Sequence, residues 1–230
     1  MKKSLLFLFG LALLASSSAS AEDVESADYS RFRFAINGGF GHGTARFPED
    51  ITTDTRSHLR KLRSGFQYEI LGMYYFSKMW GVGLKYNEFS SNAETEGYVI
   101  ITDNGTKYGR ISNDIRTRFM GAALGHRILG KKNKNCLLLN LGLGYLRYQD
   151  KMIALPDQAT IYGGTFGTYV GLGYDIRLFK TVSLGFQVAV VGGVLSEVTE
   201  NRGGSKQKIT FKDDERKGLG RVDFSVGLRF

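Results

Sequence analysis

Apolar and polar residues alternate with a period of two in eight segments of the chain. This period is typical of β-strands that have one apolar face. In the segment 137–145, for example, leucine or tyrosine fills every second position. We therefore expect eight strands, at about residues 31–42, 64–76, 80–87, 115–126, 137–145, 166–176, 182–190 and 221–230.

Side-chain size decides which face of these strands points inward. The interior of a closed eight-stranded barrel is just wide enough to be filled by side chains, so the many bulky Leu, Phe, Val and Tyr groups cannot all point into it. The bulky face must then be solvated by lipid, and the smaller and charged face must line the interior. We predict an all-β fold, a closed antiparallel eight-stranded transmembrane β-barrel with an up-and-down meander. In the segment 115–126 this assignment places Phe119 outside and Arg116 and Arg118 inside. A soluble secreted barrel or sandwich is the alternative.

The connections between the expected strands alternate in length. Short links follow the second, fourth and sixth strands, and long ones, at about 43–63, 88–112, 149–160 and 192–218, follow the others. Short periplasmic turns and long extracellular loops are typical of outer-membrane barrels, so both termini are expected in the periplasm. A hairpin signal at Asn104-Gly105 predicts that the third and fourth strands continue as a ribbon.

The first 30 residues resemble a targeting segment rather than part of the fold. Lys2 and Lys3 precede an apolar stretch, and Ala19-Ser20-Ala21 has the A-x-A form of a cleavage site. We expect a signal peptide at 1–21, a short periplasmic lead-in at 22–30, and the barrel at 31–230.

Composition excludes two further classes of protein. The apolar run Leu5–Ala15 is too short to span a bilayer as a helix. Cys136 is the single cysteine, so a disulfide scaffold is excluded.

Three stretches carry a resemblance to a known family: "YYFSKMWGVGLKYNEFS" (Tyr74–Ser90), "TYVGLGYDI" (Thr168–Ile176) and the terminal "VDFSVGLRF". They resemble the small eight-stranded outer-membrane β-barrel proteins of the OmpA/OmpX-like porin family, especially those of Bacteroidetes. The resemblance implies a place in the outer membrane of a Gram-negative bacterium. It also implies that the C-terminal residues serve as a signal for the outer-membrane assembly machinery, and Phe230, Leu228 and Val226 match that signal.

Charged residues on the inward face form the most informative group of polar side chains. Charges in a narrow lumen must be paired or hydrated, so we predict a salt-bridged plug. A narrow ion or small-solute channel through the same residues is the alternative. The residues assigned to this network are Arg31, Arg33, Glu69, Lys85, Arg116, Arg118, Asp175, Arg221, Asp223 and Arg229.

Motifs for catalysis or metal binding are sparse. His42 and His58 could bind a metal together with acidic residues of the first long connection (Glu49, Asp50 and Asp54), but they lack ligand spacing and are interpreted as surface residues. No set of Ser, His and acidic residues converges, so we predict no enzyme and no catalytic, cofactor or metal site. A lipid-modifying enzyme at the barrel rim is the rival hypothesis.

Basic residues in the first long connection provide candidate lipid contacts. The chain has 31 lysines and arginines against 22 acidic residues, and Arg46, Arg60, Lys61 and Arg63 are possible contacts to lipopolysaccharide phosphates. We predict a monomeric, non-enzymatic outer-membrane barrel whose long extracellular loops serve surface interaction or envelope integrity. Its expected partners are outer-membrane lipid, lipopolysaccharide and the assembly machinery, with no nucleic acid and no cofactor.

Overall fold

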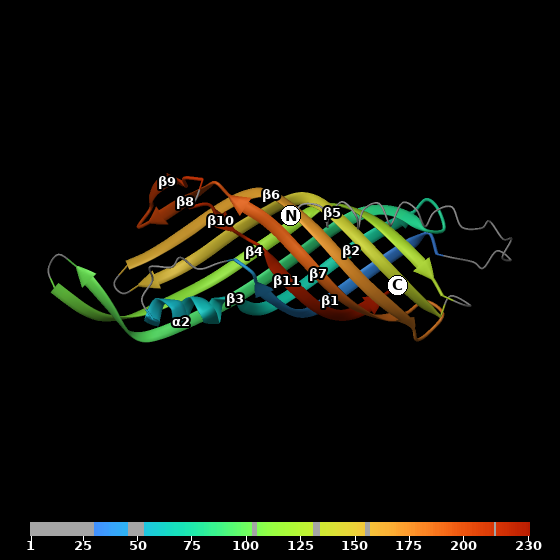
Figure 1. Ribbon diagram of the computed structural model, residues 1–230, viewed down its shortest axis with the longest axis horizontal. Helices are drawn as coiled ribbons and strands as arrows, with labels where there is room; N and C mark the ends of the chain where they lie inside the picture. Colours follow the sequence, from blue (N-terminus) through green and yellow to red (C-terminus); the bar gives the residue numbers. More distant parts are fainter. Residues whose placement is uncertain (1–29, 46–52, 103–104, 131–133, 155–156, 214) are drawn as a thin grey trace, which may run out of the picture.

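Eight antiparallel strands pair edge to edge into a closed ring in the computed structural model (Figure 1), which describes residues 30–45, 53–102, 105–130, 134–154, 157–213 and 215–230. The predicted fold class is confirmed. The strands of the ring are β1 (Phe32–Gly43), β2 (Ser64–Tyr75), β3 (Trp80–Thr102), β4 (Gly105–Leu129), β5 (Asn135–Ala154), β6 (Asp157–Arg177), β7 (Ser183–Leu195) and β11 (Arg221–Arg229).

The ring closes where the last strand meets the first. β11 pairs with β1 from Ala35↔Arg229 to Gly43↔Arg221, and its other edge pairs with β7. Next to this register, Phe34 and Phe230 exchange two backbone hydrogen bonds of 3.0 and 2.8 Å. Closure satisfies the backbone N–H and C=O groups that would cost several kcal/mol each if left unpaired in lipid.

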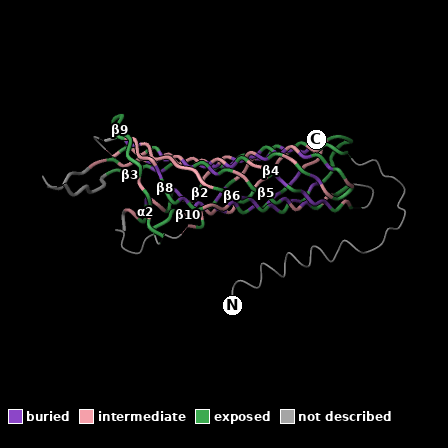
Figure 2. The backbone as a smooth tube through the Cα atoms, turned by 90° about the horizontal axis from the view of Figure 1, so that it is seen from above, coloured by how far each residue is buried: buried purple, intermediate pink, exposed green. Residues whose placement is uncertain are grey.

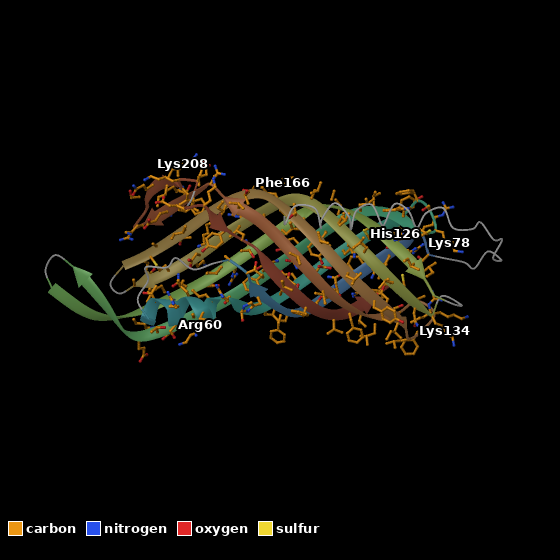
Figure 3. All side chains as sticks on the ribbon, viewed as in Figure 1. Arg60, Lys78, His126, Lys134, Phe166 and Lys208 are labelled. Carbon is orange, nitrogen blue, oxygen red and sulfur yellow. The ribbon has the colours of Figure 1, made fainter. Side chains whose placement is uncertain are left out.

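The outer face of the ring is a belt of bulky apolar side chains. Along the strands, exposed and buried positions alternate (Figure 2), and Phe40, Leu84 and Leu143 are 73%, 75% and 59% exposed. Aromatic residues border the belt, with Phe40, Phe66, Tyr145 and Phe166 on one side and Tyr74, Phe76, Phe179 and Phe230 on the other. Basic residues lie beyond both borders: Figure 3 labels Lys78 and Lys134 at one end and Arg60 and Lys208 at the other.

The two ends of the barrel differ. The end that carries Phe32 and Phe230, here the terminal end, has short connections; in one of them Ser77 accepts a 2.9 Å hydrogen bond from the amide of Trp80. At the opposite end, here the loop end, β3–β6 continue well past the belt (Figure 1). These four strands have 20 to 25 residues, whereas the other four have 9 to 13, close to the roughly 9–11 that a membrane requires.

Most of the residues expected in long loops are therefore in strands. The pairing of β3 with β4 continues to Thr102↔Gly105, which confirms the predicted ribbon. β5 and β6 pair as far as Ala154↔Asp157, so the expected loop at 149–160 is largely strand.

A helix and a second hairpin complete the loop end, and the sequence reasoning predicted neither. The helix α2 (Thr53–Leu62) lies in the first connection. In the fourth, β8 (Glu197–Arg202) and β9 (Ser205–Thr210) form a hairpin on the outer part of β6, and the short β10 (Lys217–Gly218) returns to β7. The hairpin turns at Gly203 and Gly204, whose φ angles of 57° and 90° favour glycine. Among the described residues, no helix is long and apolar enough to cross a membrane.

The interior is bulkier than predicted. Tyr75, Phe119, Leu146 and Tyr169 are at most 1% exposed and point inward together with the polar residues. The rings of Phe119 and Tyr169 lie 6.0 Å apart between their centroids. Aromatic and aliphatic groups thus fill the lumen between its charges.

The predicted facing of β4 was wrong. Phe119 points inward, whereas Arg116 and Arg118 share the outer face with Met120, which is 54% exposed. These arginines lie toward the loop end of the belt, where water and lipid head groups can solvate them. Facing outward therefore costs little there.

The lipid-facing belt makes a testable prediction on β5. Leu141 lies at the middle of the apolar run on the outer face, whereas Ile153 shares that face near the loop end. Leu141→Arg should lower the free energy of unfolding by about 2–4 kcal/mol, and Ile153→Arg by about 1 kcal/mol or less, because the cost of a charge depends on its depth in the bilayer. Urea titrations in phospholipid vesicles measure both. Equal costs at the two positions would contradict the assignment of the belt.

Candidate functional site

Charged side chains occupy the lumen at three levels. One lies toward the terminal end, one at the centre and one toward the loop end. Each level contains at least one ion pair. In two of the levels the paired residues come from different strands, and in the third both come from β11.

The central level is built around Glu69 of β2. Its carboxylate lies 2.9 Å from Lys85 Nζ, and both side chains are at most 1% exposed. It also accepts hydrogen bonds from Asn37 (2.9 Å), the Tyr169 hydroxyl (2.7 Å) and Gln187 (3.1 Å). Lys85 Nζ stands 3.5 Å from the centroid of the Tyr169 ring. Groups from five strands thus meet at one carboxylate, which compensates its desolvation.

The level toward the loop end is centred on Arg221 of β11. Its guanidinium donates to Asp223 at 3.0 Å, and both side chains are at most 3% exposed. It also donates to Thr117 and to the side-chain carbonyl of Asn87. The Phe89 ring lies 5.2 Å from the guanidinium carbon.

The level toward the terminal end is centred on Asp175 of β6. Its carboxylate pairs with Arg33 at 2.7 Å and with Arg229 at 3.3 Å. Nearby, Arg127 lies 3.7 Å above the centroid of the Tyr75 ring and donates to the backbone carbonyls of two residues at this end. Sequence reasoning did not include Arg127. Residues two apart on a strand share a face, so Arg127 faces inward as Gly125 of β4 does.

The structure places seven of the ten residues assigned to the network in the lumen. Each inward carboxylate of the set has a basic partner, as expected. However, the pairs form separate levels rather than one cluster. The residues found in the lumen are Arg33, Glu69, Lys85, Asp175, Arg221, Asp223 and Arg229. Three others lie elsewhere: Arg116 and Arg118 face outward, and Arg31 is exposed just before β1.

A cavity of about 860 Å³ lies at the loop end. Arg221 and Phe89 line it, so it meets the charged level just described. Leu59 and Leu62 of α2 line it as well, and Leu219 comes from the connection between β10 and β11. A smaller cavity of about 210 Å³ at the terminal end reaches Asp175, and other residues of that charged level line it too.

A chain of buried polar contacts holds α2 beside the loop-end cavity. His58 Nδ1 lies 2.9 Å from the Thr95 hydroxyl, and Nε2 lies 2.9 Å from Asn113 Oδ1. Asn113 in turn donates to Asp150 at 2.9 Å. His58 is 3% exposed, so its interpretation as a surface residue was wrong.

The same chain ends at the cavity. Asp150 accepts a 3.1 Å hydrogen bond from the Tyr148 hydroxyl, and Lys217 Nζ donates to that hydroxyl from a position above the ring. Desolvation of the ammonium beside the Tyr148 ring lowers the pKa of Lys217, although the residue as a whole is exposed, and the nearby Asp150 carboxylate opposes this shift.

The possible metal site in the first connection finds no support. His42 Nδ1 lies 2.9 Å from the Ser64 hydroxyl, separate from the contacts of His58. In the described part of the chain, no three His, Cys, Asp or Glu residues gather as metal ligands. Glu49 and Asp50 lie outside the described residues.

A polar cluster on the outer face lies just past the aromatic border. Glu88 of β3 accepts hydrogen bonds from Tyr86 (2.5 Å), Tyr68 (3.1 Å) and Arg118 (2.8 Å). Arg147 of β5 is the direct cross-strand partner of Arg118 and is exposed. Two cations are thus adjacent on the membrane-facing side.

The four predicted lipopolysaccharide contacts lie in different environments. Arg60 and Lys61 are exposed on the last turn of α2. Arg63 donates to the backbone carbonyl of Ala45 at 2.7 Å and lines the cavity. Arg46 lies outside the described residues.

The closed ring with its apolar belt agrees with a family match. The model of the outer membrane protein beta-barrel domain matches residues 9–229. The chain belongs to this family. No curated protein sequence matches this outer-membrane barrel significantly.

Solved structures share the barrel at low sequence identity. A major outer membrane protein from Thermus thermophilus is 13% identical with a TM-score of 0.57, over 86% of this chain and 98% of that one. Neisserial surface protein A is 12% identical with a TM-score of 0.50, over 87% and 96%. The outer membrane protease OmpT from Escherichia coli is 8% identical with a TM-score of 0.50, over 92% and 99%. These similarities establish the fold alone.

The central ion pair makes the second prediction. Glu69→Ala leaves the Lys85 ammonium buried without its carboxylate, which should lower the free energy of unfolding by about 3–5 kcal/mol. Urea unfolding, followed by the heat-dependent gel migration of the folded barrel, measures the loss.

Two further variants control this experiment. Asp213→Ala removes a side chain that is 92% exposed and paired with Arg216, and should change stability by about 0.5 kcal/mol or less. The double variant Glu69→Gln/Lys85→Met should recover most of the loss, because it removes both charges while the introduced amide oxygen still accepts hydrogen bonds from the neighbouring donors. If the single and double variants were equally destabilised, the unpaired charge would not be the cause.

Proposed function

We propose that this outer-membrane barrel is a closed, non-enzymatic, monomeric protein whose loop end faces the cell exterior and serves surface interaction or envelope integrity. The observation that carries the proposal is the paired and packed lumen. Glu69 and Lys85 meet at its centre at 2.9 Å, and neither lines the cavity at either end. Such a lumen supports a plug rather than a conduit.

The orientation rests on the asymmetry of the two ends. Outer-membrane barrels have short periplasmic turns and longer extracellular connections. With the loop end outside, both termini are periplasmic. Phe230 is 52% exposed on the outer face at the terminal end, a position open to the assembly machinery. Assignment to the OmpA/OmpX-like porins of Gram-negative Bacteroidetes belongs to the same proposal, on the motifs of the terminal and central strands.

The chemistry of the loop end favours binding over catalysis. The described lining of its cavity contains no Ser, Cys or His. His58, close by, has both ring nitrogens in hydrogen bonds and is buried. A Ser–His or Cys–His pair for nucleophilic catalysis is thus missing from the described part of this cavity. The protease activity of OmpT is a property of that protein.

Lipopolysaccharide is the proposed lipid partner. Arg118 and Arg147 lie side by side on the outer face, just past the aromatic border, at the depth where lipid phosphates lie. Guanidinium groups bind phosphate through charge-assisted hydrogen bonds. The exposed Arg60 and Lys61 of α2 add positive charge at the same end.

Conductance tests the closed lumen. The wild-type protein in planar bilayers should give no stepwise conductance. The triple variant Tyr169→Ala/Gln187→Ala/Arg221→Ala removes bulk from two levels of the lumen and should produce steps. Tyr174→Ala, on the outer face of β6, is the matched control and should stay silent. Steps in the wild type whose ion selectivity changes in Glu69→Gln would establish a channel instead.

Lipid binding tests the outer arginines. Arg147 is exposed and has no ion-pair partner among the described residues, so Arg147→Gln removes a cation without breaking an ion pair. Lipopolysaccharide with intact phosphates should raise the unfolding temperature of the wild type more than that of Arg147→Gln, and salt should reduce the difference. Arg177→Gln, exposed at the terminal end, should behave as wild type. An equal response of the two variants would exclude Arg147 as a phosphate contact.

A further inference from the structure

We propose that the loop-end cavity binds an amphipathic monoanion, an alkyl chain with a carboxylate head of the fatty-acid type. The proposal goes beyond the closed barrel and names a ligand class for its loop end. It rests on the volume of the cavity, the division of its wall into apolar and cationic parts, and the support behind the cationic part.

The volume and the apolar wall suit an alkyl chain. About 860 Å³ falls within the range of roughly 300–1,000 Å³ typical of small-molecule sites. Apolar side chains from three parts of the protein line it: Leu59 and Leu62 of α2, Phe89 and Ile115 of the barrel wall, and Phe211 and Leu219 of the fourth connection. An alkyl chain seated there removes apolar surface from water on both partners.

The charges on the wall select an anion. Four basic residues line the cavity (Arg63, Arg216, Lys217 and Arg221) against one acid (Glu215). Arg221 is already paired with Asp223 and Arg216 with Asp213. The wall thus carries more basic than acidic side chains.

Lys217 is the residue best placed to bind the carboxylate. An ammonium group has three donors, and the Tyr148 hydroxyl accepts one of them. Tyr148 is itself fixed by Asp150, which is joined through Asn113 to His58 of α2. The polar chain behind the cavity thus holds both the ammonium and the helix that supplies part of the apolar wall.

Photolabelling of the purified full-length barrel tests the proposal. The probe is dodecanoate carrying a diazirine on its chain, added to protein in phosphatidylcholine nanodiscs, and mass spectrometry locates the labelled residues. Label should appear on the cavity wall, on 59–63, on Phe211 and on 215–219, in addition to any on the lipid belt. Unlabelled dodecanoate should compete for the cavity label at least tenfold better than dodecanol, which has the chain without the charge.

Two variants and one control separate the parts of the site. Lys217→Gln should reduce cavity labelling at least fivefold, whereas Lys212→Gln should leave it unchanged, because Lys212 is exposed and does not line the cavity. Leu59→Trp keeps every charge but fills the cavity and should also reduce the label. Heat-dependent gel migration confirms that each variant is folded.

Three results would overturn the proposal: label confined to the lipid belt, equal competition by dodecanol, or wild-type labelling in folded Lys217→Gln. The assay uses purified protein, so it depends neither on the orientation in the membrane nor on whether the lumen conducts. A negative result here leaves the closed barrel intact, and a conducting lumen leaves the cavity site intact.

Discussion

The requirement that backbone polar groups be paired in lipid determines this architecture. An open sheet would leave two unpaired edges in the hydrocarbon, at several kcal/mol for each unsatisfied group. The pairing of β11 with β1 removes both edges. Closure with eight strands leaves a lumen only as wide as its side chains. Every polar residue on the inward face must then find its partner across that lumen, and this explains why Glu69 binds groups from four other strands.

Backbone groups outside the lipid do not need this complete pairing within the protein. Beyond the aromatic border, water can solvate a free strand edge, so strands can have unequal lengths. β3–β6 continue as a wall on one side of the barrel (Figure 1), while the chain from β1 and β7 departs into α2 and β8–β10. The cavity lies between these parts: α2 and the segment around Leu219 line one part of it, and the strands of the wall line the other. The membrane thus requires the closed ring, whereas the cavity results from the unequal strand lengths beyond the membrane.

Much of the barrel could be predicted from the sequence because the lipid belt imposes a period of two. The leucines of β5 alternate with asparagine and glycine, so their facing was clear. β4 has bulky residues on both faces, with Phe119 beside Met120, so size gave no contrast and arginine was wrongly expected inside. Gly203-Gly204 is a turn signal for the hairpin of β8 and β9, but the polar strands on either side lack an apolar face, so the alternation did not indicate them. Likewise, α2 buries only a few positions, so it has no clear apolar face in the sequence. The partners of His58 come from β3 and β4, and no local sequence pattern gives the register of these strands.

The buried charges also help to fix the register of the strands. Lys85 lies on β3 between Leu84 and Tyr86, both of which face the lipid. A slip of β3 by one residue would exchange its two faces. Lys85 would then lie in the belt, at a cost of about 2–4 kcal/mol near mid-membrane, and Leu84 would enter the lumen. Glu69 would lose its partner in the same event, so two unfavourable charges would result from one slip. Apolar residues of equal volume in the lumen could match the stability of the native pair. However, such residues would also be stable on the lipid face, so a slip of register would cost far less.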